Sequence, residues 1–149
     1  MRPIAFAFAA PLMLIATLAN ASPFASKNSP HDVATTMDRL AAAVEAAGAT
    51  VFVRINRAAG AAKVGQELAP NQVLIFGNPK LGTPMMQSAP SMGLDLPLKV
   101  QVYQDQDGTV RVIYRDMEGL AAEHGADSPA LAKAAGALNK FTDKAIAAE

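Results

Sequence analysis

Two amphipathic helical patterns, with strand-like segments between them, constrain the fold of this chain most. The first pattern has apolar residues at steps of four and three, which place one stripe along one face of a helix. Its stripe consists of Val33, Met37, Leu40, Val44 and Ala47. The sequence predicts that this helix begins at Ser29-Pro30, with Asp32 in its first turn, because Ser caps helices and Pro favours the first helical position. Gly48 is the expected end.

A second long helix is predicted from Ser128-Pro129 to the C-terminus, since the same Ser-Pro start occurs there. Its apolar stripe contains Leu131, Ala135, Leu138 and Ala145. Two shorter helical pieces are predicted, one or two turns at residues 58–65 and a short helix or turn at residues 117–125.

Five segments have the composition and alternation of β-strands. They are residues 22–28, 50–57, 72–76, 96–104 and 109–115. A turn at residues 105–108 joins the last two as a hairpin. The predicted order is β-α-β-β-β-β-α, and strands in an unbroken run favour an antiparallel sheet with the helices on one face. We therefore predict an α+β fold that forms one domain over residues 22–149.

The first 21 residues have the pattern of a secretory signal peptide. Arg2 precedes an apolar run at residues 4–19, and Ala19-Asn20-Ala21 is a small-x-small cleavage pattern. The run is shorter than the roughly 20 residues that cross a bilayer, so no membrane association is expected after cleavage. We predict a signal peptide at residues 1–21 and a location in the periplasm or outside the cell.

The composition excludes several classes of protein. The chain has no Cys, which excludes disulfides, thiolate zinc sites, iron–sulfur clusters and cysteine nucleophiles. It has 13 basic and 13 acidic residues, and a net charge of zero argues against a general nucleic-acid binder. We expect no cofactor and no nucleic-acid partner.

The segment at residues 78–95 is the main candidate for function. Its prolines and glycines predict an irregular loop with only brief regular structure. These residues are Pro79, Gly82, Pro84, Pro90 and Gly93. Loops of this length are usually functional or locally folded. Backbone N–H groups in such a loop are suited to an anion, with Lys80 supplying charge, whereas the alternative is a structured crossover in which Asn78 bonds its own backbone and the glycines adopt positive φ.

Other patterns are weaker candidates. Met85, Met86 and Met92 are typical of a Cu(I) site or of core packing, and we favour packing because no face is shared. Asp105-x-Asp107-Gly108 lacks the calcium-loop frame, so no metal site is predicted. His31 and His124 are expected at the surface or at helix ends, and no motif of nucleophilic catalysis is present.

The sequence resembles a known family, the domain-of-unknown-function family 302 (DUF 302). The strings that carry the resemblance are VLIFGNPKLGTPMM at residues 73–86, LDLPL at residues 94–98 and AEHG at residues 122–125. The resemblance implies a TBP-like β-α-β4-α fold and a homodimer, and it implies no established activity. The family often has Asp-His where this chain has Asn56-Arg57, so a role for that His is not carried over.

Three hypotheses for function follow. The first is a non-enzymatic, homodimeric module that binds a small molecule or a partner, with ligand-binding residues Asn78, Lys80, Thr83, Met86 and Asp95. In it Lys80 supplies charge and Met85 and Met86 form an adaptable apolar wall, with the pocket between the sheet and the segment at residues 78–95. The second is an acid/base enzyme that uses Asp95, paired with Lys80 or a backbone turn, or Glu67, together with Lys80 and Tyr114. The third is a purely structural dimerisation domain.

Overall fold

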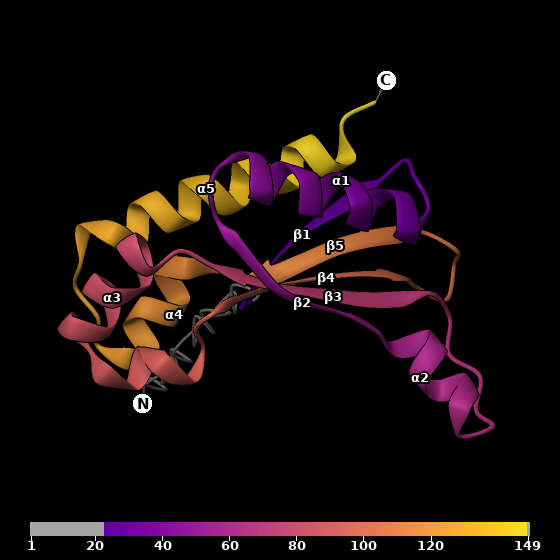
Figure 1. Ribbon diagram of the computed structural model, residues 1–149, viewed down its shortest axis with the longest axis horizontal. Helices are drawn as coiled ribbons and strands as arrows, with labels where there is room; N and C mark the ends of the chain where they lie inside the picture. The colour runs from indigo at the N-terminus through magenta and orange to yellow at the C-terminus, as the bar shows by residue number, and fades with distance from the viewer. Residues whose placement is uncertain (1–22, 149) are drawn as a thin grey trace, which may run out of the picture.

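The computed structural model describes residues 23–148, in which one antiparallel sheet is covered on one face by two long helices (Figure 1). The strands are β1 (Phe24–Ser29), β2 (Thr50–Asn56), β3 (Asn71–Gly77), β4 (Leu98–Gln104) and β5 (Val110–Arg115). The helices are α1 (Val33–Ala46), α2 (Arg57–Lys63), α3 (Pro79–Ser88), the 3-10 helix η1 (Pro90–Leu94), α4 (Met117–His124) and α5 (Pro129–Ile146). The signal peptide predicted at residues 1–21 lies outside the described residues.

The strand order across the sheet is β1-β5-β4-β3-β2, and every neighbouring pair is antiparallel. The predicted order of strands and long helices is therefore confirmed. β1 and β2 are the two edge strands. The pairing of β2 with β3 shifts between Val51 and Val53, which leaves Phe52 as the extra residue of a β-bulge.

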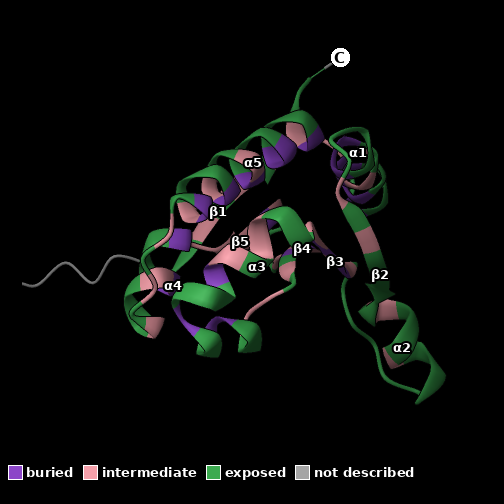
Figure 2. Ribbon diagram, turned by 60° about the vertical axis from the view of Figure 1, so that its left-hand side comes forward, coloured by how far each residue is buried: buried purple, intermediate pink, exposed green. Residues whose placement is uncertain are grey.

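The hydrophobic core lies between the sheet and the pair α1 and α5. Leu74, Phe76, Val100, Val102 and Val112 are buried on the face of the sheet that these helices cover. The helices contribute the buried residues Met37, Leu40, Val44, Leu138 and Phe141. Figure 2 shows buried stretches alternating with exposed ones along both helices, as expected for helices that bury one face. The alternation of β4 and β5 and the stripes of the helices thus define a common core, as the sequence predicts. The alternation of β2 does not contribute to it in the same way, because Val53 and Ile55 are exposed.

The start of α1 differs from the prediction. Ser29 belongs to β1, where it lies opposite Val110, and α1 begins at Val33. Asp32 is the N-cap, because its Oδ1 accepts a hydrogen bond from Thr35 N at 2.7 Å. This bond lowers the pKa of Asp32 below its ordinary value. Because Ser29 pairs in β1, the Ser-Pro sequence does not start α1, and the helix begins four residues later. At α5 the same signal is correct, since Ser128 caps the helix and Pro129 is its first residue.

The prediction of an irregular loop at residues 78–95 is wrong. The segment contains α3, of ten residues, and η1, of five. Asn78 caps α3 through a hydrogen bond from Lys80 N to its Oδ1 of 3.0 Å, and Pro79 starts the helix. Gly82 and Pro84 both lie inside α3, so neither residue breaks the helix. Neither Gly82 nor Gly93 adopts a positive φ, contrary to the expectation for the glycines of this segment.

The hairpin between β4 and β5 is held by its own carboxylates. Thr109 N donates to Asp107 Oδ1 at 2.8 Å and to Asp105 Oδ1 at 3.1 Å, and Arg111 forms an ion pair with Asp105. The hydrogen bond with the Asp105 side chain, followed by those from Thr109, lowers the pKa of Asp107 to about 2. Both carboxylates thus serve the turn, in agreement with the hairpin interpretation.

No helix within residues 23–148 combines the length and the apolar character needed to span a membrane.

We predict that Leu40→Ala lowers the free energy of unfolding by about 2–5 kcal/mol, because the substitution leaves a cavity at a fully buried site of α1. The matched control is Leu94→Ala, since the Leu94 side chain is 83% exposed and its removal should change stability by no more than about 0.5 kcal/mol. Urea denaturation followed by circular dichroism measures both. Equal losses in the two variants would contradict the placement of the core.

Candidate functional site

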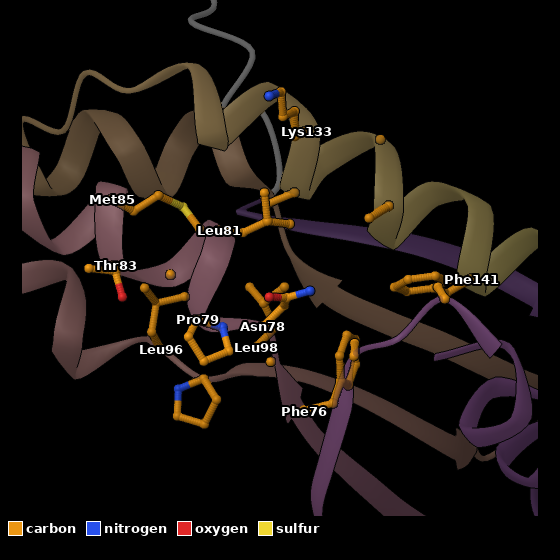
Figure 3. Close-up of a pocket in the computed structure, with 18 of the residues that line it drawn as sticks. Phe76, Asn78, Pro79, Leu81, Thr83, Met85, Leu96, Leu98, Lys133 and Phe141 are labelled. Carbon is orange, nitrogen blue, oxygen red and sulfur yellow. The ribbon is translucent and has the colours of Figure 1, made fainter. Parts of the chain in front are cut away.

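A cavity of about 930 Å³ lies between one end of the sheet and the helices α3 and α5 (Figure 3). Its lining residues come from segments far apart in the sequence. They are Ala47, Ala49, Phe52, Phe76, Gly77, Asn78, Pro79, Leu81, Gly82, Thr83, Met85, Met86, Leu96, Pro97, Leu98, Lys133, Ala134, Gly136, Ala137, Lys140 and Phe141. The volume falls within the range of about 300–1,000 Å³ that is usual for sites that hold small molecules.

The walls of the cavity are almost entirely apolar. Phe76 and Phe141 meet edge to face at one side, with ring centres 6.0 Å apart and planes at 72°. Leu98 lines it from β4, Leu96 from the segment before β4, and Met85 from α3 (Figure 3). Half of the lining residues from α5 are small, namely Ala134, Gly136 and Ala137, and they leave space between this helix and α3. The arrangement suits an apolar ligand that needs few polar partners.

Asn78 is a polar group directed into this apolar space. Its Oδ1 accepts the hydrogen bond from Lys80 N, which fixes the orientation of the amide. Figure 3 shows the side chain pointing into the cavity, with its amide nitrogen on the side of Phe76. The residue thus both begins α3 and offers an N–H donor to the cavity.

Three of the five residues predicted to bind a ligand line the cavity. These are Asn78, Thr83 and Met86, whereas Lys80 and Asp95 do not line it. Lys80 is exposed in the first turn of α3. The backbone N–H groups of this turn are already used, because Leu81 N and Gly82 N each donate to Asn78 O at 2.9 Å. The start of α3 therefore has no free N–H group at these positions for an anion.

Asp95 belongs to a separate cluster with His124 and Ser91. Its Oδ2 lies 2.8 Å from His124 Nε2, and His124 Nδ1 lies 2.9 Å from Ser91 Oγ. The expected pairing with the Lys80 side chain is not present. The His124 side chain is 11% exposed, so this histidine is more buried than the sequence predicts. The cluster ties η1 to the end of α4, which is the role of a structural clamp.

The carboxylates of the acid/base hypothesis lie at opposite ends of the sheet. Glu67 precedes Asn71, which starts β3 opposite Tyr103, and Asp95 precedes Leu98, which lies opposite Phe76 at the other end of β3. The seven residues of β3 separate these ends by about 20 Å. The structure thus does not bring Asp95 and Glu67 together.

The remaining candidates have structural contacts. Met85 and Met92 are fully buried in the core, which agrees with the packing interpretation of the methionines. Tyr114 is partly buried against the core from β5. His31 Nε2 lies 2.9 Å from Ala147 O, so this histidine contacts the end of α5.

The sequence did not indicate the two lysines of the cavity, Lys133 and Lys140, or the small residues between them. A signal was present, since the two lysines are seven residues apart and share one side of the helix. This spacing indicates a site only if another element packs against the side of the helix that carries the lysines. The spacing alone does not show whether such an element is present.

The chain belongs to the family described as "Domain of unknown function DUF302", which it matches over residues 25–148. Its fold is similar to that of an uncharacterised DUF302 protein from Bacillus stearothermophilus known from a crystal structure. The TM-score is 0.68 at 20% sequence identity, over 85% of this chain and 97% of that one. This likeness, together with the sheet and helices described above, shows the α+β fold.

Three curated relatives from Brucella are similar in part. Proteins named "Fluoride-specific ion channel FluC 1" from Brucella suis and from Brucella abortus, and one named "Fluoride-specific ion channel FluC 2" from Brucella melitensis, are each 41% identical over 96 residues. The match covers 64% of this chain and only 36–38% of those proteins. The matched part of the chain thus spans little more than a third of the length of each relative.

We predict that His124 and Asp95 are energetically coupled. In a double-mutant cycle with His124→Ala and Asp95→Asn, thermal unfolding should give a coupling of at least about 0.5 kcal/mol, because the groups bond each other in a mostly buried cluster. The control cycle combines Asp95→Asn with His31→Ala, whose imidazole contacts Ala147 instead. That pair should be additive within about 0.5 kcal/mol. Additivity in both cycles would contradict the clamp.

Proposed function

We propose that this protein is a non-enzymatic, homodimeric module that binds a small molecule and acts in the periplasm or outside the cell. The observation that carries the proposal is the apolar cavity of about 930 Å³ between the sheet and the helices α3 and α5. Asn78 and Thr83 supply hydrogen bonds, and Met85 and Met86 supply an adaptable wall. The location rests on the pattern of residues 1–21.

The chemistry of the cavity favours binding over catalysis. A general acid/base site needs titratable groups within hydrogen-bond reach of a bound substrate. Among the described residues, Lys133 and Lys140 are the titratable side chains that line the cavity, no Asp, Glu or His lines it, and the cluster of Asp95 with His124 lies outside it. The site thus has the groups that hold a ligand and lacks a paired acid and base.

We predict that Gly136→Leu strongly weakens binding of an apolar probe. Gly136 lines the cavity from α5, and a Cβ placed on it meets no atom within 4 Å, so a leucine is accommodated without a clash and adds bulk to the lining. The substitution replaces a helical glycine and gains about 0.5–1 kcal/mol in helix propensity, so the variant is expected to fold. The probe is N-phenyl-1-naphthylamine, a neutral dye that fluoresces in apolar sites. Titration of the dye should give binding to the parent protein and at least about tenfold weaker binding to the variant.

The matched control is Gly60→Leu. Gly60 lies in α2, away from the cavity, and a Cβ on it also meets no atom within 4 Å. This variant makes the same chemical change in a helix and should bind the dye as the parent protein does. Absence of dye binding by the parent protein, or equal binding by the Gly136 variant, would contradict a ligand-binding cavity and favour a purely structural domain.

For the homodimer, β2 is the proposed contact. Its outer edge has no strand beside it within the described residues. Val53 and Ile55 are each 41% exposed and Phe52 is 57% exposed. A strand of seven residues with exposed apolar side chains and an open edge is a template for pairing. Two copies related by a twofold axis would join their sheets there and cover these side chains.

We predict that Ile55→Lys yields a monomer, because a lysine on an edge strand opposes pairing of two copies. Size-exclusion chromatography with light scattering measures the molar mass. The control is Val64→Lys, since Val64 is 71% exposed after α2 and lies outside β2. We expect a dimer for the parent protein and the control. A parent monomer, or a dimer that persists in the β2 variant, would refute this contact.

A further inference from the structure

The rim of the cavity carries positive charge without opposing negative charge. Four of the lining residues have polar side chains, namely Asn78, Thr83, Lys133 and Lys140. Two of them are cationic, and none of the lining residues is Asp or Glu. A ligand that matches this lining has an apolar body and at least one negative charge.

The two lysines lie on the same side of α5. Seven residues correspond to about two helical turns, so their Cα atoms are about 10 Å apart along the axis. Gly136 and Ala137 lie between them and keep the space beside the helix open. Both lysines are exposed, and their flexible stems allow the ammonium groups to reach over the mouth of the cavity.

Neither ammonium group is engaged elsewhere. Among the described residues, Lys133 and Lys140 have no hydrogen-bond or ion-pair partner. Asp143, the acidic residue of α5, is held by Lys27 of β1, with Asp143 Oδ1 2.6 Å from Lys27 Nζ. Lys27 also bonds Thr142 Oγ1 at 2.9 Å, so this polar network lies where α5 meets β1. The charge of the two lysines is therefore available to a ligand.

We infer that the cavity binds a single-chain amphiphile with an anionic head, of the class of alkyl carboxylates. The tail lies against Phe76, Phe141 and the leucines, and the head stays at the mouth beside the lysines. Each methylene that leaves water strengthens binding by about fourfold, and the head adds selectivity through charge. This inference rests on the proposed ligand-binding function and adds the class of ligand.

The test compares three ligands with the same ten-carbon tail and different heads. Decanoate, decanol and decyltrimethylammonium each displace bound N-phenyl-1-naphthylamine from the parent protein. We expect decanoate to displace the dye at least about tenfold more effectively than the cationic ligand, because two lysines attract one head and repel the other. The difference should shrink as salt increases, since exposed charges are screened.

The test of the lysines uses two variants with equal net charge. In the first, Lys133→Gln and Lys140→Gln are combined, and decanoate affinity should fall about three- to tenfold while decanol affinity stays unchanged. In the second, Lys63→Gln and Lys144→Gln are combined. Lys63 is in α2 and Lys144 is in the last turn of α5, and neither lines the cavity. This control should retain the affinity for decanoate.

The outcomes separate this inference from the function on which it rests. If the dye does not bind the parent protein, the proposed function itself fails. If the dye binds and Gly136→Leu expels it, but the three heads displace it equally, the anionic ligand class is overturned while the cavity remains a binding site. Equal decanoate affinity in both lysine variants would also overturn the role of Lys133 and Lys140.

Discussion

The attachment of α5 is the constraint on which the rest of the structure depends. Its C-terminal half is held by β1 and α1, through Lys27 to Thr142 and Asp143 and through Arg39, whose Nη2 donates to Ala147 O at 2.8 Å. The other half extends beyond α1 and runs above α3 and α4 (Figure 1). Because a helix is stiff, fixing one half sets the height of the other half over the end of the sheet. The cavity occupies the space that remains there, between small residues of α5 and the apolar side chains of α3, β3 and β4.

The long segment between β3 and β4 has two parts with different structural roles. Its first part, α3, forms a wall of the cavity and presents Asn78 and Thr83 to it. Its second part, η1, is held to α4 by the cluster of Asp95 and His124. The cluster therefore holds the segment that follows the wall, and its side chains do not line the cavity. This separation explains why a polar cluster with the groups of an acid/base site lies beside the cavity and does not contribute to its lining.

Much of the fold could be predicted from the sequence, because its signals are local. The alternation of Val100 and Val102 in β4 and the stripe of α1 with Leu40 gave both the elements and the faces that they bury. The prediction failed at α3, since Pro84 and Gly82 are weak helix formers and obscure the period. This helix forms because Asn78 caps its start and because Met85 packs into the core, and packing outweighs propensity in short helices.

The sequence by itself determined the order of the strands and the long helices, the buried faces of β4 and β5 and the membership in the family, since each of these depends on residues that are near neighbours in the chain or form a contiguous motif. It also indicated Asn78, Thr83 and Met86, because they belong to one such motif. Only the tertiary structure decided the site. The cavity combines residues from 47 to 141, and the pairing of Lys133 and Lys140 with an apolar wall arises where α5 crosses α3. Contacts between such distant residues depend on how helices dock on a sheet, and no local period of the sequence records that geometry.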